Sequence, residues 1–230
     1  MDNLGFEKRY KTEGFVFQRR YPNEQVIQFL ASHYFSLPRS KRRKIKVLEL
    51  GCGSGANLWM IAKEGFDTYG IDLAPTSIDL CKQMLASYGV KAHVSVGNMK
   101  HPNFRSAFFD AIVDVVSVQH TNVKGHQEAY DNIFRCLKKG GRFFSWHLGS
   151  KSINFTHGGG KKLDRYTVDN TPRTTVPYPN VGILCFLTAP LAKRLLKASG
   201  FVDIHIERVT RTYKDMTQKV EFFAINVRKP

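Results

Sequence analysis

The sequence predicts an α/β fold: a doubly wound mixed sheet of about seven strands, with helices on both faces and the last strand antiparallel. Segments typical of strands and helices alternate from Lys46 onward. The run FDAIVDVVSV, residues 109–118, is apolar and β-branched, as expected of a central strand buried on both faces. Residues 216–218 leave room only for a short turn between the last two strands, which must therefore be antiparallel to each other.

Composition limits the class of protein. The 230 residues are 42% hydrophobic and 23% charged, which suits one large globular domain. The N-terminal segment is charged and the longest apolar run, residues 182–192, is too short to cross a bilayer, so we expect a soluble, cytoplasmic protein without a membrane span. The four cysteines form no CxxC pair, which predicts neither a metal site nor a disulfide framework.

Strands and helices are expected in a regular order along the chain. The first half should contain a strand at 46–50, a helix ending at Gly65, a strand at 67–73, a helix from Pro75 to Gly89 and a strand at 92–96. The second half should contain a strand at 109–118, a helix that begins at its cap Asn122, reaches Lys139 and is ended by Gly140-Gly141, and a strand at 142–147. An irregular stretch at 149–187 should follow. The chain should then form a helix from Thr188 to Ser199 and strands at 201–213 and 219–228. A helix over about 23–37 should cap an edge or the ligand side of the sheet.

The first predicted strand runs into a glycine-rich turn, residues 49–55 with the sequence ELGCGSG. Such a turn brings backbone N–H groups close to a ligand. Residues 51–56 also satisfy the dinucleotide pattern G-x-G-x-x-A, and Asp72 ends the second strand where a ribose-binding acid would lie, so a dehydrogenase is one alternative. Three features weigh against a dinucleotide-binding site. They are the acidic Glu49 inside the first strand, Gly55 that completes the pattern G-x-G-x-G, and the roughly forty-five residues that precede the turn.

An ordered set of motifs favours a class other than a dehydrogenase. VLELGCGSG at 47–55 resembles the first motif of class I S-adenosylmethionine-dependent methyltransferases, and YGIDL at 69–73 resembles their second-strand motif. Four further segments of this chain resemble later motifs of that family, in the same order: VGNM at 96–99, FDAIVDVVSVQH at 109–120, LKKGGRFF at 137–144 and FLTAPLAKRLLKASGF at 186–201. The resemblance covers about residues 47–201, and Asn98 departs from it because many members carry Asp there.

The resemblance implies a Rossmann-like fold, S-adenosyl-L-methionine as cofactor and S-adenosyl-L-homocysteine as product. It implies that the glycine turn approaches the methionyl group, that Asp72 binds the ribose, and that Leu73 and Met99 sandwich the adenine. The alternatives are a surface carboxylate at Asp72 and core packing of Met99. Asp114, inside the fourth strand, must be paired or touch the cofactor side. The expected cofactor residues are Glu49, Gly51, Cys52, Gly53, Asp72, Leu73, Asn98, Met99 and Asp114.

Methyl transfer to a hydroxyl is helped by a general base, and histidine is the usual choice. His120 follows the fourth strand and His147 ends the fifth, so both should lie at the carboxyl edge, where open α/β sheets bind ligands. Both are candidate catalytic residues. The alternative for each is packing or a hydrogen bond to the backbone.

The net charge of the whole chain is +16, and the excess of basic residues lies on both sides of its central part. Residues 1–46 are interpreted as a helical cap and basic linker, and 47–230 as a methyltransferase domain with a substrate lid over 149–187. The basic run at 39–46 precedes the amino end of the first strand, away from the chemistry, and is interpreted as a solvated linker. The lid residues expected to meet an anionic acceptor are Lys161, Lys162, Arg165 and Tyr166, with Arg173 and Tyr178 nearby.

Three functions are compatible with these features. The first is methyl transfer to an oxygen or nitrogen of a small, anionic or sugar-like metabolite. The second is methylation of RNA or another nucleic acid, favoured by the positive charge but not by any amino-methylation motif, catalytic Pro-Cys pair or appended RNA-binding module. The third is a non-catalytic subunit that binds the cofactor.

Overall fold

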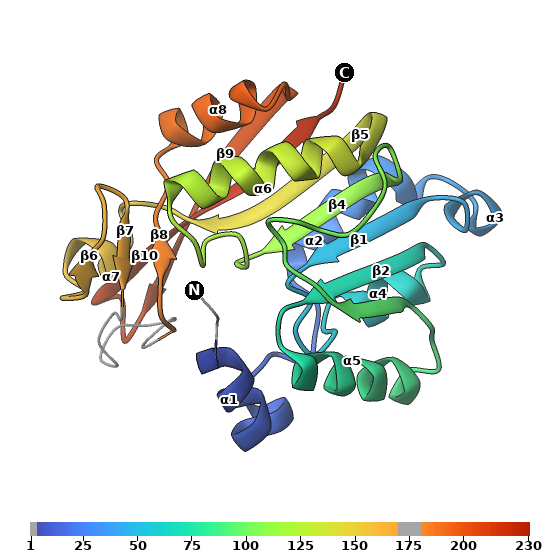
Figure 1. Cartoon of the computed structure of the whole chain (residues 1–230), viewed down its shortest axis with the longest axis horizontal. Helices are drawn as coiled ribbons and strands as arrows, with labels where there is room; N and C mark the ends of the chain where they lie inside the picture. The colour runs from blue at the N-terminus through green and yellow to red at the C-terminus, as the bar shows by residue number, and fades with distance from the viewer. Residues whose placement is uncertain (1–3, 170–180) are drawn as a thin grey trace.

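The computed structural model describes residues 4–169 and 181–230, and in it seven strands form one mixed sheet (Figure 1). In sheet order they are β3 (His93–Val96), β2 (Asp67–Asp72), β1 (Lys46–Leu50), β4 (Phe109–Val115), β5 (Leu137–Leu148), β10 (Gln218–Arg228) and β9 (Val202–Tyr213). Strand β10 is antiparallel to both its neighbours, β5 and β9, whereas the other pairs of neighbouring strands are parallel. The predicted Rossmann-like sheet with an antiparallel last strand is confirmed.

Helices cover both faces of the sheet, because the side chains of its central strands alternate between two apolar clusters. On β1, Val47 belongs to the cluster that includes residues of α2 (Glu24–Leu30), α4 (Leu58–Lys63) and α5 (Pro75–Ser87). Its neighbour Leu48 belongs to the cluster that includes residues of α6 (Val123–Cys136) and α8 (Ala189–Ala198). Figure 1 shows α6 and α8 side by side on one face.

Two strands, β5 and β4, begin or end several residues away from their predicted bounds. Helix α6 ends at Cys136, and Gly140-Gly141, predicted to end this helix, lies inside β5 instead. The left-handed φ of +76° at Gly140 accommodates a shift in the pairing of β5 with β4. Strand β4 stops at Val115 rather than at residue 118, since the Asp114 carboxylate accepts hydrogen bonds from the backbone of Ser117 and Val118 and turns the chain.

Before β1 the chain contains a helix that we did not predict, α1 (Leu4–Glu13), followed by a 3-10 turn at Gly14–Val16. Glu7 ties α1 to the start of α5: its carboxylate accepts hydrogen bonds from the Thr76 amide, at 3.1 Å, and hydroxyl, at 2.7 Å. Figure 1 shows α1 beside the first turn of α5, at the carboxyl edge of the sheet. The N-terminal segment thus covers the edge where a ligand would bind.

The predicted helix over 23–37 is found as α2 and a π-helical turn, Ala31–Phe35, and it packs on a face of the sheet, where Phe29 stacks on Phe144 at 5.2 Å. The basic run at 39–46 includes a short helix, α3 (Arg39–Arg42), and is therefore not wholly a linker. Arg42 is structural, because its guanidinium pairs with Glu64 at 2.5 Å and lies over two aromatic rings.

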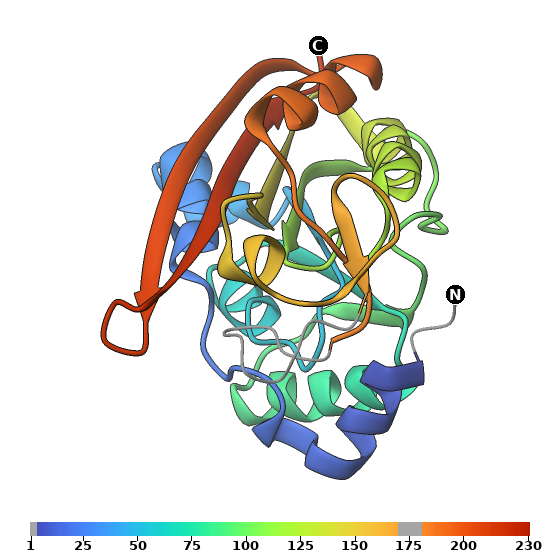
Figure 2. The same cartoon turned by 90° about the vertical axis from the view of Figure 1, so that its left-hand side faces the viewer.

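The predicted irregular stretch at 149–187 is partly ordered. Its described residues form helix α7 (Ile153–Thr156) and a three-stranded sheet of β6 (Lys161–Lys162), β7 (Thr167–Asp169) and β8 (Leu184–Cys185). Figure 2 shows these elements together at the carboxyl edge, beside the long β9–β10 hairpin that forms one edge of the main sheet. Within residues 4–169 and 181–230, no helix is long and apolar enough to cross a membrane.

The N-cap of α6 offers a test of the fold. The Asn122 side chain accepts a hydrogen bond from the Gly125 amide at 2.9 Å. We expect Asn122→Ala to lower the free energy of unfolding by about 1 kcal/mol, because an N–H group at the helix start loses its acceptor. Asn122→Asp keeps the acceptor and is the matched control. Urea denaturation of the three proteins measures the effect, and equal losses in both variants would contradict it.

Candidate functional site

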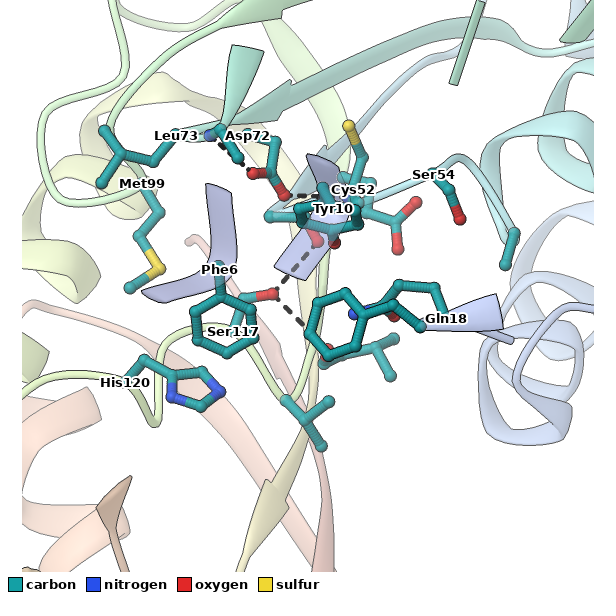
Figure 3. Close-up of a pocket in the computed structure, with 18 of the residues that line it drawn as sticks. Phe6, Tyr10, Gln18, Cys52, Ser54, Asp72, Leu73, Met99, Ser117 and His120 are labelled. Carbon is teal, nitrogen blue, oxygen red and sulfur yellow. Dashed lines mark hydrogen bonds between the residues drawn. The ribbon is translucent and has the colours of Figure 1, made fainter. Parts of the chain in front are cut away.

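A cavity of about 510 Å³ lies at the carboxyl edge of the sheet, between α1 and the ends of β1, β2 and β4 (Figure 3). Its size is in the usual range for a small-molecule site. The sequence-predicted residues that line it are Glu49, Gly51, Cys52, Gly53, Asp72, Leu73, Asn98, Met99 and His120. The predicted residues that do not line it are Asp114, His147, Lys161, Lys162, Arg165 and Tyr166.

The glycine turn after β1 forms one wall of the cavity. Gly51 and Gly53 have φ angles of +62° and +53°, which favour glycine. The Ser117 hydroxyl donates to the Gly51 carbonyl oxygen at 3.2 Å, and a Cβ atom at Gly53 would lie only 2.8 Å from the Tyr10 hydroxyl. Only glycines allow the surrounding side chains to approach the turn this closely.

Asp72, the last residue of β2, faces the glycine turn. One carboxylate oxygen accepts a hydrogen bond from the Gly53 amide and the other from the Ala74 amide, both at 2.9 Å. Burial raises the pKa of this carboxyl above its ordinary value. Since each carboxylate oxygen has two lone pairs, each can still accept a hydrogen bond from a ligand hydroxyl.

Glu49 is the most deeply buried acid of the cavity, with 2% of its surface exposed. Its Oε1 atom accepts a hydrogen bond from the Asn57 side-chain amide, while its Oε2 atom has no hydrogen-bond partner among the described residues. Burial raises the pKa of Glu49 to about 8, and the nearby Arg19 guanidinium partly opposes this shift. An unsatisfied buried carboxylate oxygen facing a cavity is suited to a cationic ligand group.

Leu73 and Met99 line the cavity next to Asp72 (Figure 3), and Asn98 is a further lining residue. Leu73 is 46% exposed although it is large and apolar. The Asn98 side-chain oxygen accepts a hydrogen bond from the Lys100 amide at 2.9 Å, which orients the side chain and leaves its NH₂ group for a ligand. These residues offer an apolar slot with one polar group.

Asp114 lies beneath the cavity and has no exposed surface. Its Oδ1 atom accepts from the Ser117 and Val118 amides at 2.9 and 3.0 Å, and its Oδ2 atom from the Ser145 hydroxyl at 2.7 Å. Burial raises its pKa to about 6. The structure therefore pairs Asp114 within the protein, where it shapes the turn leading to His120.

His120 lies at the cavity wall opposite the glycine turn. Its Nδ1 atom is 3.1 Å from the Ile183 carbonyl oxygen, and the Phe6 ring packs edge-on against the imidazole with centroids 4.9 Å apart. Because a carbonyl can only accept, Nδ1 carries the proton and Nε2 keeps its lone pair. Burial lowers the pKa of His120 to about 4, so the ring is neutral near pH 7.

The structure does not bring His147 to the cavity. It is fully buried on the face covered by α6, where its Nε2 atom lies 2.8 Å from Nε2 of His126 and its Nδ1 atom 2.8 Å from the Leu148 carbonyl oxygen. The sequence predicted that His147 lies at the carboxyl edge of the sheet, but it did not predict the contact of His147 with His126 of α6. Both ring nitrogens are therefore occupied within the protein.

The predicted lid residues lie outside the cavity. Lys161 and Lys162 form the exposed strand β6, and the Arg165 guanidinium lies over the Tyr166 ring at 5.5 Å. Two further lid residues, Arg173 and Tyr178, lie outside the described residues. The described part of the lid reaches the cavity only at Val181.

Six cavity residues missed by sequence reasoning come from the N-terminal segment. They are Phe6, Arg9, Tyr10, Phe17, Gln18 and Arg19. One signal was available: Phe6 and Tyr10 are four residues apart, and so are Glu7 and Lys11, and Arg9 and Glu13, the spacing of side chains on one helix face. This pattern predicts a helix with an aromatic stripe.

Comparison with known proteins agrees with the fold and the motifs. Residues 47–141 match a family described as a methyltransferase domain. The chain is 25% identical over 140 residues to a tRNA N(3)-methylcytidine methyltransferase of Schizosaccharomyces pombe, covering 57% of this chain and 44% of that protein. It is 28% identical over 205 residues to a sterol 24-C-methyltransferase of Neurospora crassa, covering 84% of this chain and 49% of that protein. The chain thus spans about half the length of these relatives.

Solved structures share the fold over nearly the whole chain. A 1,6-didemethyltoxoflavin-N1-methyltransferase of Burkholderia thailandensis, solved with 1,6-didemethyltoxoflavin and S-adenosylhomocysteine bound, superimposes with a TM-score of 0.69 at 17% identity, covering 99% of this chain and 86% of that one. Residues 47–141 are thus similar to a methyltransferase domain, and the fold of the chain is that of solved S-adenosylmethionine-dependent methyltransferases.

The pKa of Glu49 predicts how stability depends on pH. A folded-state pKa of about 8, above the ordinary 4.5, means that the folded protein binds the proton more tightly than the unfolded chain. The free energy of unfolding should therefore fall as the pH rises from 4.5 to 8. Glu49→Gln removes this component. The free energy of unfolding of the variant, taken relative to that of the wild type, should therefore rise by more than about 1 kcal/mol from pH 5 to pH 8.5. Urea denaturation at both pH values measures the difference, and parallel behaviour of the two proteins would refute it.

Proposed function

We propose that this chain is an S-adenosylmethionine-dependent methyltransferase that transfers a methyl group to a small acceptor molecule. The observation that carries the proposal is the set of groups that line one cavity. Glu49 and Arg19, an acid and a base, line it together with the Asp72 carboxylate and the apolar side chains of Leu73 and Met99. These three kinds of group suit an amino-acid zwitterion, a ribose diol and an adenine ring.

The zwitterionic end would be held by opposite charges. Glu49 has a buried oxygen without a partner, which suits the methionyl ammonium group. Arg19 lines the same cavity and makes no ion pair with a described residue, so it is available for the methionyl carboxylate. A bound ammonium would restore the charge of Glu49 by lowering its pKa.

Asp72 and the apolar slot would hold the nucleoside. Its carboxylate can accept hydrogen bonds from both ribose hydroxyls while keeping those from Gly53 and Ala74. A dinucleotide fits less well, because its pyrophosphate at the glycine turn would not supply the positively charged partner that lets the buried Glu49 ionise. The burial of Glu49 thus favours a cationic ligand over a dinucleotide.

The bound cofactor supplies a methyl group activated by a positively charged sulfur. The protein's part is to exclude water, to orient the acceptor, and to take a proton. His120 lines the cavity and its Nε2 atom makes no hydrogen bond with a described residue, which supports a role as the base. A weak base suffices for a hydroxyl, since the acceptor oxygen becomes strongly acidic as it bonds to the methyl carbon.

A small acceptor is favoured because α1 covers the cavity and is fastened by the Glu7–Thr76 hydrogen bonds. Lys161, Lys162, Arg165 and Tyr166 would then contact only a part of the acceptor that projects from the cavity. The second candidate is RNA methylation, in which a single base enters the cavity. It is supported by the net charge of +16 and by the similarity to a tRNA methyltransferase.

Cofactor binding is the first test. We expect S-adenosylhomocysteine to raise the melting temperature and NAD to leave it unchanged, since a ligand stabilises the state that it binds. Asp72→Ala should weaken S-adenosylhomocysteine binding by about 1.5 to 3 kcal/mol in calorimetry, the scale of hydrogen bonds to a charged group. Asp79→Ala, an exposed acid of α5, is the matched control. Stabilisation by NAD alone would overturn the proposal.

The acceptor class is tested with isotopically methyl-labelled cofactor and a cell extract, followed by mass spectrometry. We expect label in small molecules and not in RNA. Reversing two exposed charges of the basic run, Arg43→Glu with Lys44→Glu, should leave turnover nearly unchanged, because these residues lie far from the carboxyl edge. Label in RNA, lost in a salt-dependent way in this double variant, would instead establish nucleic-acid methylation.

A further inference from the structure

The cavity has a second half that the proposed cofactor contacts do not use. Its walls are the rings of Phe6, Phe17 and His120, with Val116 and Val181 beside them. Figure 3 shows the Phe6 ring directly beside His120, on the side away from Asp72. This half is where an acceptor would have to lie.

The rings support one another in a row. Phe6 packs edge-on against His120 at 4.9 Å, Phe6 and Phe17 are 5.8 Å apart, and Phe17 packs edge-on against Tyr10 at 5.0 Å. Aromatic side chains in such contacts are held in defined orientations. The row therefore presents a rigid wall of ring faces and edges, which is complementary to a flat molecule.

This half of the cavity offers no free charge among its described residues. Arg9 donates two hydrogen bonds to the Glu13 carboxylate, at 2.9 and 3.2 Å, and its guanidinium lies 4.0 Å above the Phe17 ring. Arg9 is thereby neutralised and serves to hold Phe17. A phosphate or carboxylate placed against these rings would lose its hydration without gaining a charged partner, and so would an alkylammonium group.

Nε2 of His120 is a polar atom of this half that makes no hydrogen bond with a described residue. Because Nδ1 donates its proton to the Ile183 carbonyl, Nε2 accepts a hydrogen bond and cannot donate one. A group placed beside it must therefore carry a proton to give. A hydroxyl meets this requirement, and a ketone or an ether does not.

We propose that the acceptor is a hydroxyl on a flat, uncharged aromatic ring, which packs against Phe6 and Phe17 and directs its O–H at Nε2 of His120. This assignment rests on the proposed function. In the transfer, a lone pair of the hydroxyl oxygen forms the new bond to the methyl carbon, the sulfur–carbon bond breaks with its electron pair remaining on sulfur, and the hydroxyl proton passes to Nε2.

An alkylamine acceptor does not suit this arrangement. Such an amine is protonated near pH 7 and must lose a proton before it can attack. Burial holds the pKa of His120 near 4, far below that of an alkylammonium, so the imidazole cannot remove that proton. The same weak base can take the proton of an oxygen that is already bonding to carbon.

Four compounds of one ring skeleton test the assignment. With the protein saturated by S-adenosylhomocysteine, binding of 2-naphthol is followed by its fluorescence, and decahydro-2-naphthol, 2-naphthyl phosphate and 2-naphthylmethylamine are tested as competitors. We expect 2-naphthol to bind at least about tenfold more tightly than each competitor, a difference of about 1.4 kcal/mol. Equal or tighter binding of the saturated, the anionic or the cationic compound, or no binding by any of the four, would overturn the assignment.

Variants locate the binding. Phe6→Leu keeps an apolar side chain but removes the ring, so it should weaken 2-naphthol binding severalfold and leave S-adenosylhomocysteine binding unchanged. Val16→Leu, at an exposed position of the same segment, is the control and should change neither. If S-adenosylhomocysteine fails to bind the wild type, the proposed function itself is wrong. If it binds and Phe6→Leu leaves 2-naphthol binding unchanged, only the acceptor assignment is wrong.

Discussion

The hydrogen bond from the Gly53 amide to the Asp72 carboxylate joins the ends of β1 and β2, and the rest of the site depends on it. The same carboxylate accepts from Ala74, the residue before α5, and so fixes where that helix begins. The first turn of α5 then presents Thr76 to Glu7 of α1. A single acid at a strand end thus determines the shape of the glycine turn, the start of α5 and the position of the helix that covers the cavity.

Three acids gather at this edge of the sheet, and burial raises the pKa of each. Asp114 is fully satisfied by the protein, Asp72 is partly satisfied, and Glu49 has an oxygen with no partner. The cost of burying these groups falls as the number of their hydrogen bonds rises. Glu49, the acid with an unsatisfied oxygen, is therefore the one best suited to a positively charged ligand. The cofactor that we propose carries two positively charged groups.

The strands and the glycine turn could be predicted because their signals are local: apolar runs that end in glycine, and an acid at the end of the second strand. The position of helix α1 over the cavity could not be predicted, because it depends on contacts between residues far apart in the sequence, such as Glu7 with Thr76. Lys161 and Lys162 were placed in the right segment, but the pairing of β6 with β7 leaves them exposed. Local patterns thus predicted the cofactor side of the site, whereas the proposed acceptor side required the folded structure.

His120 and His147 show why a position along a strand does not determine a role. Both lie at the predicted edge of the sheet, and burial lowers the pKa of both. His147 points toward α6, where His126 and a backbone carbonyl occupy its two nitrogens. His120 follows the turn shaped by Asp114, which directs it to the cavity with one nitrogen bound to a carbonyl and the other without a described partner. Since a base must have a lone pair facing its substrate, the hydrogen bonds of the two rings, rather than their place in the sequence, favour His120.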